Sequence, residues 1–161
     1  MWPIELAAAD DPATPTMLRL LQAWTGRADQ LGHIVHTGPP VLSRGDANLL
    51  NRLWSDADGR IRCVDFEHSG YSTVAFDAAD LTEHISARGI SDDRWEEILP
   101  DLGITPALRP AYESARRTCA LRRLAVLWRR RTTRPADFEA QLARTRALFA
   151  ATGGRCRIDG A

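Results

Sequence analysis

The sequence predicts an α+β domain that is mainly helical and contains one small β-hairpin. Two short apolar runs, Leu49–Trp54 and Arg60–Phe66, flank the segment Ser55–Gly59, and an Asp-Gly pair between such runs is a strong hairpin signal. From residue 78 onward the chain has the apolar spacing of helices. With 161 residues and 44% apolar content, the chain is long enough to bury a core of its own.

The segment before the hairpin is predicted to form an irregular lead-in, one helix and a loop. Three prolines interrupt residues 1–15, and Thr14 or Thr16 is the expected cap of the helix. Apolar side chains at helical spacing follow this cap. Gly26 or Gly32 is the expected end of the helix, because glycine is common just past helix C-termini.

Four helices are predicted after the hairpin. Ser91 or Asp92 is the expected cap of the second, and Pro135 suits the first turn of the fourth, where its missing N–H leaves no bond unmade. The expected bounds are 78–88, 91–99, 106–131 and 135–151. The tail after Gly153 is expected to fray.

Charge and cysteine content limit the classes of function. The formal net charge is +0, which gives no general attraction to nucleic acid or to a membrane surface. No apolar run approaches the roughly 20 residues that a membrane span requires. The 3 cysteines show no pairing pattern, which favours reduced thiols and a cytoplasmic protein. The chain contains no lysine, so arginine supplies all 21 basic side chains.

Eight arginines between residues 116 and 134 form a basic stripe on and after the predicted helix 106–131. Such a stripe is compatible with an anionic partner. Tyr112, Cys119 and Trp128 interleave with it at helical spacing, however, and predict a buried face. We therefore expect the arginines to lie on the opposite, solvated side and expect no nucleic-acid partner.

Three polar residues around the hairpin have the side chains that phosphoryl transfer requires. Asp46 precedes the first strand of the hairpin, and Asn51 lies five residues after Asp46. Asp65 is at the end of the second strand. The reaction needs a carboxylate to accept the proton of the attacking hydroxyl and oxygen ligands for Mg²⁺. We expect Asp46 to be the base and Asn51 and Asp65 to hold the metal. The alternative is that these side chains only cap the loop and the strand end.

These residues form motifs that resemble the aminoglycoside phosphotransferase and choline/ethanolamine kinase family. The family shares an H-x-D-x-x-x-x-N loop, which Asp46 and Asn51 match here. After a hairpin it has a metal motif such as D-F-E, which Asp65-Phe66-Glu67 matches, and then a further aspartate, which Asp77 matches. The resemblance covers residues 41–85 closely. It implies the C-terminal lobe of a protein-kinase-like fold and an ATP- and Mg²⁺-dependent transferase acting on a small-molecule hydroxyl. ATP or another nucleoside triphosphate is the implied donor.

The resemblance also implies supporting roles for three residues. Glu67 is expected to assist the metal or shape the site, and Asp77 to brace the loop. Arg44 stands where the family has histidine, and we expect it to pair with Asp77 or, less favoured, with a phosphate.

The residues that bind the acceptor remain unspecified. Choline-type kinases hold a quaternary ammonium with aromatic rings, and aminoglycoside enzymes use carboxylates. Tyr112 and Trp128 are expected in the core between helices rather than in an aromatic cage around a quaternary ammonium. Asp80 and Glu83 follow Asp77 on the same predicted helix, where a solvated face is the default expectation.

The family binds ATP between two lobes and contacts its phosphates with a lysine from the N-terminal lobe. This chain has no lysine and no glycine-rich loop, so we expect it to represent the C-terminal lobe alone, with little kinase activity in isolation. The expected divisions are 1–40 for the lead-in and helix, 41–77 for the motifs, 78–152 for a helical subdomain and 153–161 for the tail.

A second interpretation is a non-catalytic remnant that serves as a binding or dimerisation module. In either case we expect an apolar surface that would face the missing N-terminal lobe, and in the isolated chain a second copy or the N-terminal segment should cover it. Its candidate residues are Leu49, Leu50, Leu53 and Val64 on the hairpin, with Trp2 and Ile4 at the start of the chain.

Overall fold

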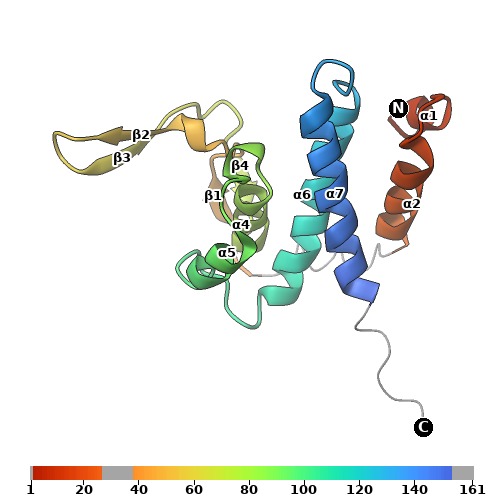
Figure 1. Cartoon of the computed structure of the whole chain (residues 1–161). Coiled ribbons are helices and arrows are strands. Elements are labelled where there is room, and N and C mark those ends of the chain that lie inside the picture. Colours follow the sequence, from red (N-terminus) through yellow and green to blue (C-terminus); the bar gives the residue numbers. More distant parts are fainter. Residues whose placement is uncertain (1, 27–37, 154–161) are drawn as a thin grey trace, which may run out of the picture. The chain divides into compact units, whose positions relative to one another are not determined.

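Helices dominate the structure, a computed structural model that describes residues 2–26 and 38–153 (Figure 1). Two small antiparallel sheets of two strands each complete the described part, so the predicted α+β, mainly helical class is confirmed. The chain divides into two compact units. We call Asp29–Arg116 the hairpin unit, and Met1–Ala28 together with Arg117–Ala161 the helical unit.

The two sheets belong to the hairpin unit. Strands β2 (Arg52–Ser55) and β3 (Arg60–Cys63) form the predicted hairpin, whose turn is closed by the Gly59 N–H donating to the Ser55 carbonyl at 2.9 Å. The hairpin extends away from the rest of its unit (Figure 1). The second sheet pairs β1 (Val41–Ser43) with β4 (Gly70–Ser72), a pairing that the sequence did not predict.

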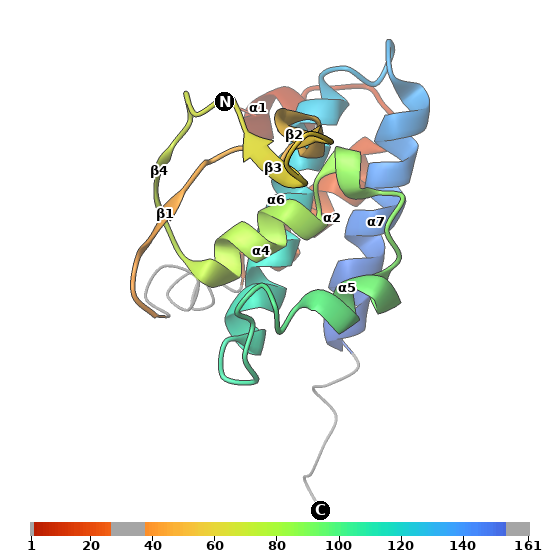
Figure 2. The ribbon, with the colours of Figure 1, turned by 90° about the vertical axis from the view of Figure 1, so that its left-hand side faces the viewer.

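The hairpin unit also contains short helices, the first of which follows directly after β4 (Figure 2). Their bounds are α4 Val74–Thr82, the 3₁₀ turn η2 Ile85–Ala87 and α5 Asp92–Ile98. Helix α4 begins four residues before the predicted start, because the Thr73 side chain caps it by accepting from the Phe76 N–H. Ser91 caps α5 as predicted.

The core of the hairpin unit lies under the loop that carries Asp46. Its fully or nearly fully buried side chains come from that loop, from α4, from η2 and from α5: Ala47, Leu81, Ala87 and Trp95. Leu49 packs against this cluster from the 3₁₀ turn η1 (Leu49–Asn51). Burial of these apolar groups stabilises the position of the loop relative to α4 and α5.

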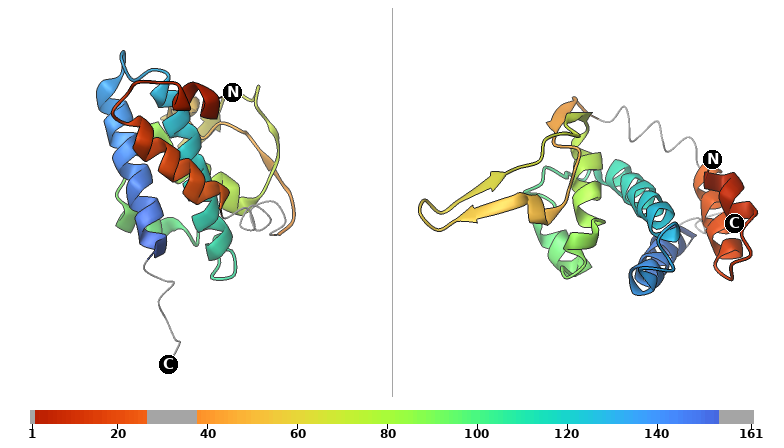
Figure 3. Two further views of the ribbon diagram at one scale, coloured as in Figure 1. Left: turned by 90° about the vertical axis from the view of Figure 1, so that its right-hand side faces the viewer. Right: turned by 90° about the horizontal axis from the view of Figure 1, so that it is seen from above.

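The helical unit contains α1 (Trp2–Ala7), α2 (Thr14–Thr25), α7 (Pro135–Gly153) and the part of α6 (Arg109–Trp128) from Arg117 onward. Helix α2 contacts both α1 and α7 (Figure 3). The bounds of α6 and α7 agree with the prediction to within three residues. The predicted tail lies outside the described residues from 154 onward.

Two predictions for the N-terminal segment are wrong. Residues 2–7 are helical rather than irregular, because Leu6 is completely buried and α1 packs against α2. No threonine caps α2: the N-cap is Ala13, without a side-chain hydrogen bond, and the Thr14 hydroxyl donates to the Ala9 carbonyl instead. Gly26 ends the helix, as predicted.

The prediction that the charged residues of α4 and α6 lie on solvated faces is partly wrong. Tyr112, Cys119 and Trp128 are buried as expected, but Arg116 and Arg117 are buried as well. Asp80 and Glu83, expected on a solvated face, are only 6% and 5% exposed. Arg116 donates to Glu83 at 2.8 Å, so opposite charges that are close in space compensate each other's burial.

No helix within the described ranges, 2–26 and 38–153, is both long and apolar enough to cross a membrane.

Candidate active site

The loop between β1 and η1 is held against the chain segment that follows the hairpin. Pairing of β1 with β4 places Ser43 opposite Gly70. Gly45 has a φ of +71°, and a Cβ on it would collide with the His68 carbonyl group. The loop therefore requires glycine at this position, both for the left-handed backbone and for the close approach.

Arg44 fastens this loop to the end of β3. Its guanidinium donates to the carbonyl oxygens of Val64 at 3.0 Å and Asn48 at 3.2 Å, and also to that of Asp46. The favoured ion pair with Asp77 is not formed, since these backbone carbonyls lie within reach of the guanidinium. Arg44 thus supports the loop through its backbone.

Both oxygens of the Asp46 carboxylate are hydrogen-bonded. Oδ1 accepts from the Asn48 N–H at 3.0 Å, which caps the loop, and Oδ2 accepts from Nδ2 of Asn51 at 2.7 Å. Burial alone would raise the pKa of Asp46. The Asn48 hydrogen bond, the electrostatic attraction of Arg44 and His84 and the Asn51 hydrogen bond outweigh it, so the pKa lies below its ordinary value. Asp46 is therefore ionised at neutral pH.

Asn51 connects the two candidate carboxylates. Its Nδ2 donates to Asp46 Oδ2 and, at 3.1 Å, to Asp65 Oδ2. The backbone supports the same contact, because the Val64 N–H donates to the Asn51 carbonyl at 3.0 Å. The structure thus brings together Asp46, Asn51 and Asp65, as the sequence predicts.

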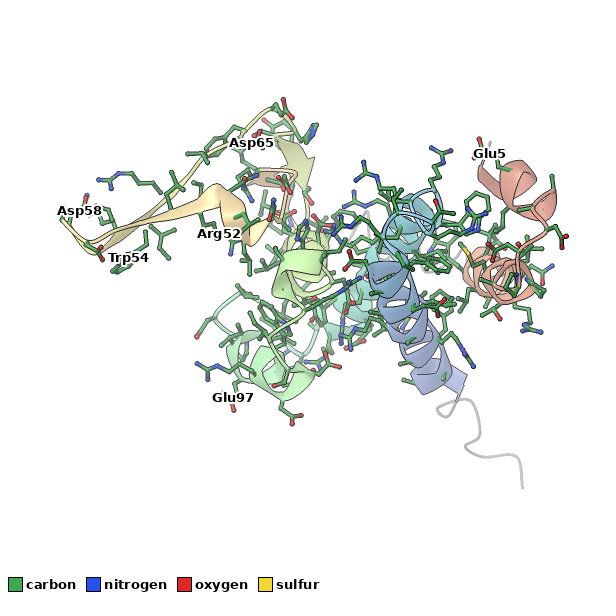
Figure 4. The ribbon with its side chains drawn as sticks, turned by 45° about the horizontal axis from the view of Figure 1, so that its top comes forward. Glu5, Arg52, Trp54, Asp58, Asp65 and Glu97 are labelled. Atoms are coloured by element: carbon green, nitrogen blue, oxygen red, sulfur yellow. The ribbon has the colours of Figure 1, made fainter. Side chains whose placement is uncertain are left out.

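Asp65 has a φ of +66°, the only positive value among the described residues other than glycine. Aspartate tolerates the left-handed region better than most residues, but such a conformation still costs energy. The conformation occurs at the residue whose carboxylate meets Asn51, at the base of the hairpin. Figure 4 shows Asp65 and Arg52 near this base, and Trp54 and Asp58 farther out.

The other two predicted residues lie outside this cluster. The Glu67 carboxylate is exposed and lies 3.5 Å from Nε2 of His68, and it makes no described contact with Asp46, Asn51 or Asp65. Asp77 lies in the first turn of α4. Its carboxylate forms no hydrogen bond or ion pair within the described part of the chain, so a bracing contact to the loop is not seen.

A pocket of about 370 Å³ opens beside Asp46, between the loop, β1 and α4. Three acidic and two basic residues border it: Asp46, Asp77, Asp80, Arg44 and Arg52. Apolar residues of β1 and α4 also border the pocket. Asp77 and the candidate base Asp46 thus border the same pocket.

The donor set suits a hard cation such as Mg²⁺, which proteins bind through one or two carboxylates together with phosphate oxygens. In residues 2–26 and 38–153, no three His, Cys, Asp or Glu side chains are grouped to hold a metal by themselves, so this set depends on the amide of Asn51. Nδ2 of that amide faces both carboxylates. Rotation of the amide by about 180° exchanges its nitrogen and oxygen and would present Oδ1 to a cation.

Sequence reasoning missed one residue next to the candidate base. Nε2 of His84 lies 4.0 Å from Asp46 Oδ1, and the two side chains are only 15% and 23% exposed. His84 follows α4 and is far from Asp46 in the sequence, so no local spacing pointed to it.

No protein-family model matches the chain, and no curated protein sequence matches it.

Proposed function

We propose that this chain is the catalytic, C-terminal lobe of a kinase-like phosphotransferase that uses Mg²⁺ and a nucleoside triphosphate to phosphorylate a small-molecule hydroxyl. The observation that carries the proposal is the contact of one amide, Asn51, with the two carboxylates of Asp46 and Asp65. Capping alone explains the Asp46–Asn48 hydrogen bond, but it does not explain why Asp65 adopts a left-handed backbone at this point.

In the proposed reaction Asp46 accepts the proton of the acceptor hydroxyl. The hydroxyl oxygen forms a bond to the γ-phosphorus, the bond from that phosphorus to the bridging oxygen breaks, and the nucleoside diphosphate leaves. Asn51 and Asp65 would hold the metal, which when bound neutralises negative charge on the phosphate oxygens. The lowered pKa of Asp46 keeps its carboxylate ionised and able to orient the hydroxyl.

The phosphates need further positive charge. The chain has no lysine, the guanidinium of Arg44 is hydrogen-bonded to backbone carbonyls, and Arg52 is the other basic residue that borders the pocket. We propose that a separate nucleotide-binding lobe supplies a further phosphate-binding cation, so that the isolated chain binds metal and nucleotide but turns over little.

Metal binding tests this proposal directly. We expect Mn²⁺, added with a nucleoside triphosphate and followed by electron paramagnetic resonance, to bind the wild-type chain and to bind Asp65→Asn about tenfold or more weakly. Asparagine also tolerates the left-handed backbone, so the variant should remain folded. Asp101→Asn is the matched control, because it removes an equal charge from an exposed position after α5. Equal affinities of the wild type and Asp65→Asn would contradict the proposed site.

The second candidate function, a binding or dimerisation module, rests on the apolar surface of the hairpin unit. Its large apolar side chains are 40% to 87% exposed: Leu42, Leu50, Leu53, Trp54, Ile61, Val64, Phe66 and Tyr71. So much exposed apolar surface is unusual for a monomer and is commonly covered by a partner.

We expect this surface to mediate self-association as a two-fold dimer. Light scattering at high concentration should give twice the mass of the chain for the wild type and the monomer mass for Leu50→Glu. Val126→Glu, a similar change at a 51% exposed position of α6, should leave the dimer intact. A monomeric wild type would exclude the dimerisation module.

A further inference from the structure

His84 is held in one orientation by Ser86. The backbone N–H of Ser86 donates to Nδ1 of His84 at 3.1 Å, and the Ser86 hydroxyl oxygen lies 2.7 Å from the same nitrogen. His84 is thereby the N-cap of η2. Since a backbone N–H can only donate, Nδ1 must be the acceptor in this pair.

The Ser86 hydroxyl also contacts the loop that carries the candidate base. Its oxygen accepts from the Leu49 N–H at 2.9 Å, which leaves the hydroxyl proton to be donated to Nδ1 of His84. Nδ1 thus carries no proton, and the proton of the neutral imidazole is on Nε2.

Nε2 of His84 is the atom that faces Asp46 Oδ1. The separation of 4.0 Å exceeds a direct hydrogen bond, so the contact in this structure is one between an N–H dipole and a negative charge. Both groups are mostly buried, where such attractions are screened less than in water. Contacts of catalytic groups commonly shorten when substrate binds.

Packing keeps the two segments together. Ala47 and Leu49, on either side of Asn48 in the loop, pack in the cluster that contains Ala87 of η2. His84 and Ser86 therefore contact the loop at two points, the Asp46 carboxylate and the Leu49 N–H, over an apolar base that limits relative movement.

We propose that His84, anchored through Nδ1 by Ser86, is a positioning residue that orients the Asp46 carboxylate for its role as base. The role as base rests on the phosphotransferase function proposed above. Attraction of Oδ1 toward Nε2–H, together with the Asn48 N–H, fixes one carboxylate oxygen and keeps Oδ2 directed at Asn51. The imidazole thus lies beside the aspartate even though arginine occupies position 44.

Two substitutions separate positioning from simple capping. His84→Gln places an amide N–H near the position of Nε2 but loses the acceptor for the Ser86 N–H. His84→Asn keeps an acceptor near the position of Nδ1, and asparagine is a good N-cap, but it has no donor toward Asp46. If His84 only caps η2, the asparagine variant should resemble the wild type. If His84 positions Asp46, the glutamine variant should resemble the wild type instead.

The reporter is the side-chain amide of Asn51, observed by NMR in the chain without metal or nucleotide. We expect its protons to be protected from exchange in the wild type, to stay protected in His84→Gln and to lose protection in His84→Asn. His68→Gln, which changes an exposed imidazole, should have no effect. Any other ranking of the two His84 variants overturns the proposal.

The tautomer of His84 provides a second test that needs no variant at this position. Nitrogen chemical shifts of the wild type should show that Nε2 carries the proton and that Nδ1 does not. A protonated Nδ1 in the neutral ring would overturn the proposal even if His84→Asn fails to fold. Neither measurement requires metal or turnover. Failure of Mn²⁺ binding would therefore reject the proposed function without affecting the contact between His84 and Asp46.

Discussion

Replacing Gly45 with alanine should destabilise the hairpin unit by about 3 kcal/mol or more. The left-handed backbone at Gly45 costs an alanine about 1–2 kcal/mol. The added Cβ also collides with the His68 carbonyl group, and backbone atoms cannot move aside as a flexible side chain can. Overpacking of this kind typically costs a further ~1–3 kcal/mol. Urea unfolding measured by circular dichroism gives the difference in free energy.

Gly59→Ala is the matched control for this substitution. Gly59 has a similar φ of +64°, but the nearest atom to its added Cβ is on the Trp54 ring at 3.9 Å. Gly59→Ala should therefore lower the free energy of unfolding only by the cost of the left-handed backbone, about 1–2 kcal/mol. Equal destabilisation by the two substitutions would mean that the loop around Asp46 does not lie against His68, and the proposed site would lose its geometric basis.

Replacing Arg116 with methionine should cost about 3–5 kcal/mol of unfolding free energy, since it removes the guanidinium that pairs with the buried carboxylate of Glu83. The side chains of Arg116 and Glu83 are 8% and 1% exposed, and Nε lies 2.8 Å from Oε1. Arg116 also contacts Asp92 at 3.1 Å, so it joins the end of α4 to the start of α5. Thermal and urea unfolding measure the loss.

Two further variants test the cause of that loss. Glu83→Gln in the Arg116→Met background removes the buried negative charge that Arg116 paired with and should restore part of the stability. Arg94→Met breaks an ion pair with Glu97 whose members are 65% and 62% exposed, and it should cost less than about 1 kcal/mol. If Arg116→Met were as mild as Arg94→Met, the Arg116–Glu83 pair would not be a buried contact in solution.

Local chemistry determined much of this protein from the sequence alone. The Asp58-Gly59 turn predicted the hairpin because glycine adopts the left-handed backbone without strain. Ser91 and Pro135 marked helix starts because capping and the missing proline N–H act within one turn. The residue types and spacing of Asp46, Asn51 and Asp65 predicted the cluster that the structure contains.

Tertiary structure decided the rest, because it depends on contacts between segments that are distant in the sequence. The β1–β4 pairing, which brings Gly45 against His68, has no signal within either short strand. Arg116 and Glu83 look like solvated charges until α4 and α6 pack and bury them together. His84 reaches Asp46 only because Ala47 and Leu49 share a core with η2. Periodicity reports which face of an element is apolar, and it carries no information about which polar side chain packing will bring to that face.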